Sequence, residues 1–330
     1  MKKVCVIGYG YWGKNIARVF NESPTFELSA VCEADPKARA LAAKLYPQVE
    51  LLDSFESIGP EISVVAIVTP TNTHFELAKH CLERGFHVFI TKPMTRTYEQ
   101  TEELFALARK KNLMLWADHT FVFNPAVRKL KENLPRIGRP LLLISQRLNL
   151  GLYQPDVNVI YDLMPHDLSI ACFLFDNVIT KATTFAHAAA GLPQEDVAHT
   201  SFELENGVHG LITVSWLSPQ KVRQFFVVGT DGMLCYDDVE VAEKVKFYDK
   251  GLSFEQLSRP GDPQSYTSQV SYRSGDMFSP AVPNTEALKF ELEEFARTFE
   301  DPTLQSYYEN LNNGVMKSLS TVVNSRGQAS

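Results

Sequence analysis

Residues 4–13 read VCVIGYGYWG, and this stretch decides the fold of the amino-terminal part of the chain. Residues 4–7 are a continuous β-prone run, whereas after the glycines the apolar side chains recur at helical spacing, as at Ile16 and Phe20. This change of period predicts a strand, a tight turn and a helix.

The three glycines of the turn, Gly8, Gly10 and Gly13, match the pattern G-x-G-x-x-G. A plain strand-to-helix turn is the alternative interpretation, because glycines recur in many turns. Here, however, the first glycine ends a predicted strand and the third begins a predicted helix, so that a pyrophosphate can approach the backbone and reach the helix N–H groups. The pattern therefore predicts a dinucleotide site.

An acidic residue is expected about 20 residues beyond such a turn, where it accepts hydrogen bonds from the adenosine ribose. Glu33 stands at that place, directly after a predicted strand over residues 28–32. A 2′-phosphate would face this carboxylate, and no arginine is expected beside it to compensate the charge, so the sequence favours NAD over NADP. Asp35, before Pro36, is better interpreted as a helix N-cap.

Alternating strands and helices continue up to about residue 120. Strands are predicted over residues 62–68, 87–90 and 113–116, and helices over residues 36–45, 75–83 and 98–110. Repeated β and α segments predict a doubly wound parallel sheet, an α/β Rossmann domain over residues 1–120.

The pattern changes after residue 120. A helix over residues 125–134, a long strand over 140–150 and a helix over 161–175 are predicted. The pairs Asn206-Gly207 and Asp231-Gly232 indicate tight hairpins. A long loop over 257–283 and a final helix over 285–299 complete the expected order of elements. Residues 121–330 are thus predicted to form an α+β domain with a mostly antiparallel sheet.

Composition excludes several classes of protein. The chain has 330 residues, 45% of them hydrophobic and 22% charged, with a net charge of −7. This acidic balance argues against nucleic acid or an anionic membrane as a partner. The five cysteines form no C-x-x-C pair, so neither a disulfide framework nor a zinc site is expected. Without a signal-like segment or a long apolar run, the expected location is cytoplasmic.

Four motifs together resemble the Gfo/Idh/MocA family of oxidoreductases. They are the glycine turn, residues 69–74 (TPTNTH), residues 91–93 (TKP) and residues 162–166 (DLMPH). The family's usual Glu-Lys-Pro is Thr-Lys-Pro here, and the arginine of its Phe-Arg-Phe-Asn-Pro is Val122. Residues 147–151, 156–160 and 215–219 are similar to the branch that includes nucleotide-sugar 3-dehydrogenases.

The resemblance implies that the sheet of residues 121–330 is open, helps to bind substrate and mediates oligomerisation. NAD is the expected cofactor, and no metal is expected, because no third or fourth ligand stands near Asp162 and His166. Asp162 and His166, four residues apart, share one face at the start of a helix, and Lys92 follows a buried parallel strand. These three are the expected catalytic residues. The implied cofactor-binding residues, besides the three glycines and Glu33, are Tyr11, Trp12, Thr69, Pro70, Asn72, His74 and Lys92. Candidate substrate residues are Asn124, Arg147, Asn149 and Tyr153.

The expected function is hydride transfer between NAD and a secondary alcohol or ketone of a sugar, sugar nucleotide or polyol. A non-catalytic regulator that binds NAD and a metabolite, and an NAD-assisted glycosidase, are the alternatives on the same scaffold. Homodimers or homotetramers are expected, because an open sheet exposes apolar side chains on one face. For Arg147, Asn149 and Tyr153, a solvated strand end is an alternative to a pocket lining, and His74 either contacts the cofactor or caps a helix.

Overall fold

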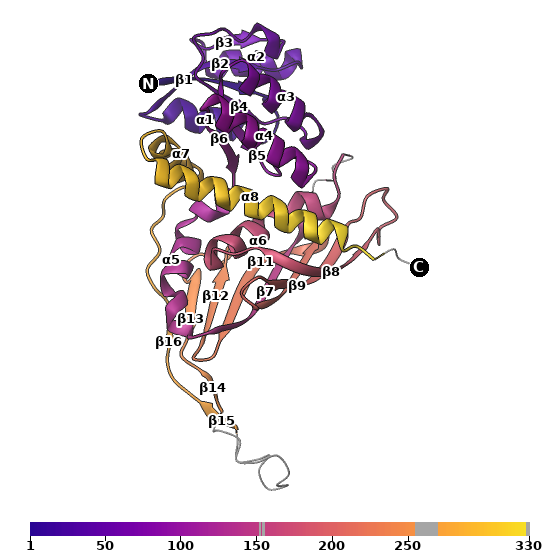
Figure 1. Cartoon of the computed structure of the whole chain (residues 1–330), viewed down its shortest axis with the longest axis vertical. Coiled ribbons are helices and arrows are strands. Elements are labelled where there is room, and N and C mark those ends of the chain that lie inside the picture. The colour runs from indigo at the N-terminus through magenta and orange to yellow at the C-terminus, as the bar shows by residue number, and fades with distance from the viewer. Residues whose placement is uncertain (152, 154–155, 255–269, 328–330) are drawn as a thin grey trace. The chain divides into compact units, whose positions relative to one another are not determined.

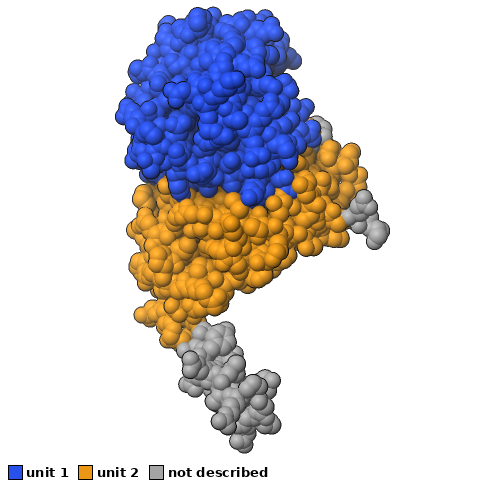
Figure 2. Space-filling model, in the orientation of Figure 1, with its two compact units in different colours: residues 1–124, 285–320 blue, residues 125–284, 321–330 orange. Residues whose placement is uncertain are grey.

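The computed structural model describes residues 1–151, 153, 156–254 and 270–327, and this part of the chain divides into two units. Unit 1 comprises residues 1–124 and 285–320, and unit 2 comprises residues 125–284 and 321–330 (Figure 2). The return of residues 285–320 to the amino-terminal unit is a feature that the sequence did not indicate.

Unit 1 is built on a six-stranded parallel sheet with the order β3-β2-β1-β4-β5-β6 (Figure 1). Its strands are β1 (Lys2–Ile7), β2 (Phe26–Cys32), β3 (Glu50–Leu52), β4 (Val64–Ile67), β5 (His87–Thr91) and β6 (Leu115–Asp118). The order reverses between β1 and β4, which is where ligands bind in open α/β sheets. The predicted Rossmann fold is confirmed, and only the short β3 was not expected.

Helices cover both faces of this sheet. They are α1 (Gly13–Glu22), α2 (Pro36–Leu45), α3 (Thr71–Glu83), α4 (Tyr98–Lys111), α7 (Ala287–Thr298) and most of α8 (Pro302–Asn324), with the 3-10 turns η1 (Phe55–Ser57) and η2 (Thr120–Phe123). Asp35 caps α2 as predicted, because its side chain accepts from the N–H groups of Lys37 and Ala38. Between the sheet and α7, Phe89 and Trp116 pack against Phe295.

Unit 2 is built on an eight-stranded sheet with the order β16-β13-β12-β11-β7-β10-β9-β8. Its strands are β7 (Pro140–Leu150), β8 (Ile179–His187), β9 (Val197–Leu204), β10 (His209–Ser215), β11 (Leu217–Gly229), β12 (Met233–Asp237), β13 (Val245–Tyr248) and β16 (Met277–Phe278). All neighbours are antiparallel except β10 and β7, so the sheet is mixed and mostly antiparallel, as expected. Both predicted hairpin turns are present, between β9 and β10 and between β11 and β12.

One face of this sheet is covered by helices, with α6 (Val159–Phe175) packed on β7, β9 and β10, and α5 (Pro125–Asn133) packed on β12 and β13. The short 3-10 turn η3 (Leu134–Ile137) follows α5. Most of α6 is apolar and buried, which is typical of a helix inside a core. Phe185 on β8 and Leu211 on β10 remain exposed.

Two expectations about the carboxyl-terminal region were wrong. The long loop was predicted over residues 257–283, of which 257–269 lie outside the described residues. The described remainder contains β15 (Val270–Arg273), paired with β14 (Gly251–Phe254), and also β16. The final helix is α8 and not α7. No helix in the described ranges is long and apolar enough to cross a bilayer.

Candidate functional site

The turn between β1 and α1 has the backbone that its glycines predict. Gly8 has φ +94°, and a Cβ there would lie 2.5 Å from the carbonyl oxygen of Val68. A Cβ on Gly13 would lie 2.2 Å from the carbonyl oxygen of Gly8, so only glycine lets α1 begin this close to the strand. These two glycines therefore close the turn.

Gly10 has a different role from the other two glycines. A Cβ at Gly10 would meet no atom within 4 Å, so the space beside it is open. The N-cap residue of α1, Trp12, makes no side-chain cap hydrogen bond. An open backbone surface and an uncapped helix start together fit a pyrophosphate, which would accept hydrogen bonds from the first N–H groups of α1.

Gly10→Val is expected to weaken NAD binding at least about tenfold, because the new side chain would fill the space into which the phosphates must come. Folding should be unaffected, since that space is open. The matched change Gly13→Val should instead lower the thermal unfolding temperature. Calorimetric titration with NAD and thermal unfolding of both variants check this, and wild-type NAD affinity in Gly10→Val would contradict it.

Glu33 is held at the end of β2 by its own carboxylate. The side chain accepts hydrogen bonds from the backbone N–H of Tyr9 at 2.6 Å and of Asp35 at 2.8 Å. Its two oxygens are thus fixed beside the glycine turn and keep further lone pairs for ribose hydroxyls. The expectation that no arginine lies near was wrong, because Arg39 on α2 donates to the carbonyl oxygens of Glu33 and Ala34.

The TPTNTH motif forms the loop after β4 and the first turn of α3. Thr69 bonds to Thr73 through their hydroxyl groups at 2.7 Å, while Pro70 is the N-cap and Asn72 is exposed. His74 is buried, with Nδ1 3.0 Å from the carbonyl oxygen of Pro93 and Nε2 2.8 Å from that of Thr69.

Burial lowers the pKa of His74, whereas the carbonyl oxygens of Thr69 and Pro93 act in the opposite direction. Because both ring nitrogens face carbonyl oxygens, His74 braces the loops after β4 and β5 against each other. This geometry favours a structural role for His74 over contact with the cofactor. Tyr11, by contrast, is 78% exposed beside the glycine turn.

Lys92 directly follows β5, the strand between β4 and β6. It is half-buried and emerges at the carboxyl edge of the sheet, the same edge as the glycine turn. Thr91, the residue before Lys92 in the Thr-Lys-Pro motif, is buried, and its hydroxyl donates to the carbonyl oxygen of Ile67 at 3.3 Å. Unit 1 therefore places the glycine turn, Glu33 and Lys92 along one edge.

In unit 2, Asp162 and His166 lie on the less buried side of α6. Both are half-buried, whereas Leu163, Met164 and Asp167 around them are buried. One turn of helix separates the two side chains, as their spacing predicts. The pair can therefore present a carboxylate and an imidazole to the same ligand.

Trp216 contacts the candidate residue Asp162 and was not itself predicted from the sequence. Its Nε1 donates to Oδ2 of Asp162 at 2.9 Å and so fixes the direction of that carboxylate. A Cβ on Gly151 would lie 2.4 Å from Cδ1 of Trp216, so this glycine makes room for the indole. Tyr153 meets Trp216 edge to face, with ring centroids 6.2 Å apart. In the sequence, Trp216 lies in residues 215–219, which are similar to one branch of the family. That similarity is the one sequence signal that could have indicated a role for Trp216.

The other substrate candidates are placed differently. Arg147 is buried, and its guanidinium binds Asp167 of α6 through Nε at 2.8 Å and Nη2 at 3.0 Å. A solvated strand end is thereby excluded for Arg147. Asn149 is half-buried on β7, and in unit 1 Asn124 ends η2. Tyr153 is 42% exposed.

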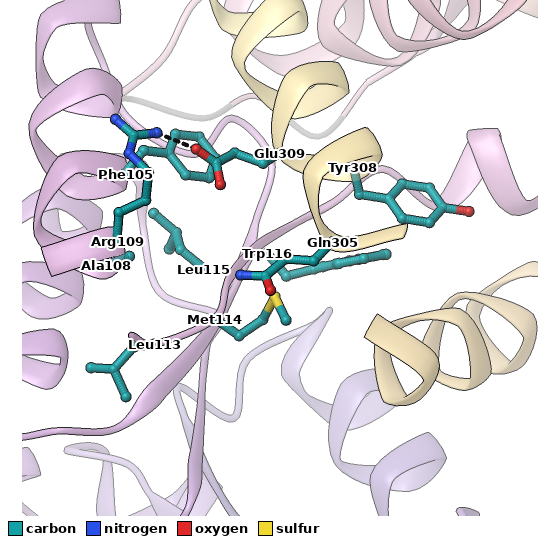
Figure 3. Close-up of a pocket in the computed structure, with 10 residues that line it drawn as sticks. All are labelled: Phe105, Ala108, Arg109, Leu113, Met114, Leu115, Trp116, Gln305, Tyr308 and Glu309. Atoms are coloured by element: carbon teal, nitrogen blue, oxygen red, sulfur yellow. Dashed lines mark hydrogen bonds and ion pairs between the residues drawn. The ribbon is translucent and has the colours of Figure 1, made fainter. Parts of the chain in front are cut away.

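A small pocket in unit 1 lies away from these residues (Figure 3). Its lining residues come from α4, α8, the first residues of β6 and the segment that leads into it, Leu113 and Met114, and an ion pair joins Arg109 to Glu309. Because Leu113 and Met114 precede β6, this pocket opens at the amino edge of the strands, opposite to the edge that carries Lys92. Among the described residues, no group of three or more His, Cys, Asp or Glu side chains could hold a metal ion.

Comparison with known proteins agrees with this geometry. Residues 2–119 match the family model described as oxidoreductase family, NAD-binding Rossmann fold, and residues 150–235 match the Gfo/Idh/MocA C-terminal domain. UDP-N-acetylglucosamine 3-dehydrogenase of Acidithiobacillus ferrooxidans is 29% identical over 232 residues, which are 68% of this chain and 71% of that protein. The NAD-dependent scyllo-inositol 2-dehydrogenase of Bacillus subtilis is 25% identical over 68% of this chain and 71% of its own.

The fold comparison extends over nearly the whole chain. The crystal structure of the Acidithiobacillus ferrooxidans enzyme superposes with a TM-score of 0.79 at 22% identity, covering 98% of this chain and 97% of that one. Both halves thus match models of the same family, in the order in which they occur in the chain. The chain belongs to the Gfo/Idh/MocA family of oxidoreductases.

Proposed function

We propose that this protein is an NAD-dependent dehydrogenase that transfers a hydride between the cofactor and a secondary alcohol or ketone of a sugar, sugar nucleotide or polyol. The observation that carries the proposal is the open backbone at Gly10 beside the fixed carboxylate of Glu33, in a chain that also presents Asp162 and His166. The relatives named as sugar-nucleotide and inositol dehydrogenases support this substrate class. In this division, unit 1 binds the cofactor and unit 2 contributes to substrate binding.

Proton transfer is assigned to three side chains of this chain. As the hydride leaves carbon, the hydroxyl proton must leave oxygen, which requires a base and a group that stabilises the developing charge. His166 is proposed as the base, Lys92 as the hydrogen-bond donor to the same oxygen, and Asp162 as the residue that orients the pair or holds substrate. Exchanged roles, with Lys92 taking the proton, are the alternative. The indole of Trp216 fixes Asp162 for this task.

NAD is proposed as the preferred cofactor because Glu33 offers two fixed carboxylate oxygens to the ribose diol. A 2′-phosphate would be repelled by the same carboxylate, and the nearby Arg39 is bound to backbone carbonyl groups. NADP is therefore expected to bind about 100-fold more weakly than NAD. Titration of both cofactors checks this, and Glu33→Gln should narrow the difference. Equal affinity of the wild-type chain for NAD and NADP would contradict the assignment.

The activity itself is tested by incubating the purified protein and NAD with a panel of sugar nucleotides, inositols and free sugars while following absorbance at the NADH band. Growth of that band with one class of substrate supports the dehydrogenase. NAD binding without reduction by any member would favour a regulator. Release of nitrophenol from a nitrophenyl glycoside, without net NADH, would favour an NAD-assisted glycosidase.

Self-association through unit 2 is proposed as well, because Phe185 and Leu211 are 59% and 46% exposed on the eight-stranded sheet. A homodimer or homotetramer would cover such side chains. Light scattering at micromolar concentration is expected to give a dimeric or tetrameric mass. A monomeric mass would contradict this part of the proposal.

A further inference from the structure

Two buried carboxyl groups lie beside the glycine turn in unit 1 and are not used by the proposed chemistry. Asp118 is the last residue of β6 and Glu291 lies on α7, with 3% and 0% of their surfaces exposed. Burial, together with the charge and hydrogen bonding of Asp118, raises the pKa of Glu291 well above its ordinary value. The raised pKa favours the neutral acid, which would donate its O–H to the Asp118 carboxylate.

The remaining hydrogen bonds of Glu291 agree with this assignment of the proton. Its Oε1 accepts from the indole Nε1 of Trp116 at 3.1 Å and from the backbone N–H of His119 at 3.0 Å. Its Oε2 is buried and meets no donor among the described residues, so the proton of the neutral acid would sit on this oxygen. Burial lowers the pKa of His119 to about 4, so this neighbour is neutral.

Asp118 connects this pair to the cofactor side of the unit. It accepts from the backbone N–H of Thr120 at 3.0 Å and, through Oδ2, from the indole Nε1 of Trp12 at 2.9 Å. Trp12 is the residue of the glycine turn at which α1 begins. In the sheet, Asp118 pairs with Thr91, the residue that precedes Lys92. Asp118 thus contacts the turn after β1 through its carboxylate and the strand that precedes Lys92 through its backbone.

A purely structural core would not need this arrangement. Burying two carboxyl groups in contact is unfavourable unless each oxygen is hydrogen-bonded, and apolar side chains of similar volume are often at least as stabilising. The indole of Trp12 has one donor, and that donor is used on a residue 106 positions away in sequence. The bond fixes the rotamer of the residue whose backbone meets the pyrophosphate.

We propose that Asp118 and Glu291 are positioning residues for the dinucleotide: Asp118 holds the Trp12 indole, and with it the last part of the glycine turn, in the conformation that receives the cofactor, while Glu291 supports Asp118. The inference rests on the proposed use of NAD. It predicts that Trp12 and Asp118 act on NAD affinity as one unit, and that Glu291 acts through its O–H and not through a charge.

The test measures NAD dissociation constants by calorimetry and thermal unfolding of the same full-length variants without cofactor. Trp12→Phe keeps the ring, lies at a half-buried position and is expected to fold, yet to bind NAD about tenfold more weakly. Asp118→Ala should weaken binding at least as much. The double variant should be no weaker than Asp118→Ala alone, because both changes remove the same contact.

Two further variants separate positioning from stability. Glu291→Gln keeps a donor toward Asp118 and should bind NAD within about twofold of the wild type, whereas Glu291→Ala should resemble Asp118→Ala. Trp116→Phe is the matched control, since it removes the other indole donor without touching the glycine turn. It should lower the unfolding temperature and leave NAD affinity within about twofold of the wild type.

Several results would overturn the inference. Wild-type NAD affinity in Trp12→Phe would do so, as would effects of Trp12→Phe and Asp118→Ala that multiply in the double variant. Equal loss in Trp116→Phe and Trp12→Phe would show that only the stability of unit 1 matters. If the wild-type chain itself does not bind NAD, the proposed function fails and this inference fails with it.

Discussion

Turnover is expected to fall roughly 100- to 10,000-fold when His166 is replaced by Asn or Lys92 by Met, because each change removes a group that handles the hydroxyl proton or the charge it leaves behind. NAD affinity should stay nearly unchanged, since the glycine turn and Glu33 hold the pyrophosphate and the ribose. Steady-state rates on the true substrate measure the loss of turnover, and calorimetric titration with NAD measures the cofactor affinity.

The hydrogen bond from Trp216 to Asp162 provides a control for the variants His166→Asn and Lys92→Met. Trp216→Phe keeps the aromatic ring beside Gly151 but removes the donor to Asp162, so it should reduce turnover less than loss of His166 does. Full activity in both His166→Asn and Lys92→Met would remove these residues from the chemistry and favour the regulator.

The second large effect concerns the ion pair between Arg147 and Asp167, whose side chains are each only 3% exposed. Asp167→Ala leaves a buried guanidinium uncompensated, and we expect a loss of about 3–5 kcal/mol in the free energy of unfolding. The double change Arg147→Met with Asp167→Leu should recover much of that loss, because it removes both charges. Urea unfolding of the full chain measures this.

The exposed pair of Lys181 and Glu203 is the matched control, because it also joins two neighbouring segments of unit 2. Lys181→Ala should leave the urea midpoint almost unchanged, since solvent already screens the pair. A similar midpoint shift in Lys181→Ala and Asp167→Ala would contradict the claim that burial makes the Arg147–Asp167 pair important for stability. Because Asp167 follows His166 on α6, Asp167→Ala should also reduce turnover by letting the helix shift on the sheet.

The amino-terminal fold was predictable because short-range signals agree there. The run before Gly8, the spacing after Trp12 and the acidic Glu33 each indicate the same βαβ unit, and parallel strands bring their carboxyl ends to one edge. Because β5 is one of these parallel strands, the sequence also predicts that Lys92, which follows it, lies at the carboxyl edge of the sheet. The order of strands in unit 2 was not predictable, since β7 pairs with β10 and β11 across long sequence separations.

The final helix and the long-range contacts were not predicted from the sequence, for physical reasons. In α8, the buried residues Tyr308, Leu311, Val315 and Val322 do follow helical spacing, but many Ser, Asn and Thr residues between them weaken the pattern. Contacts such as Trp12 with Asp118 and Arg147 with Asp167 join residues far apart in sequence. No local pattern reports such pairs, so the burial of Arg147 and the Trp216 donor to Asp162 required the structure.

The most direct measurement follows the hydride itself. A sugar-nucleotide or inositol substrate from the activity screen, deuterated at its carbinol carbon, is incubated with NAD and the protein, and the reduced cofactor is analysed by mass spectrometry. We predict NADH that carries one deuterium, together with the corresponding ketone, and loss of both products in His166→Asn. Reduced cofactor without deuterium, or no reduced cofactor with any deuterated member of the panel, would contradict the proposed dehydrogenase.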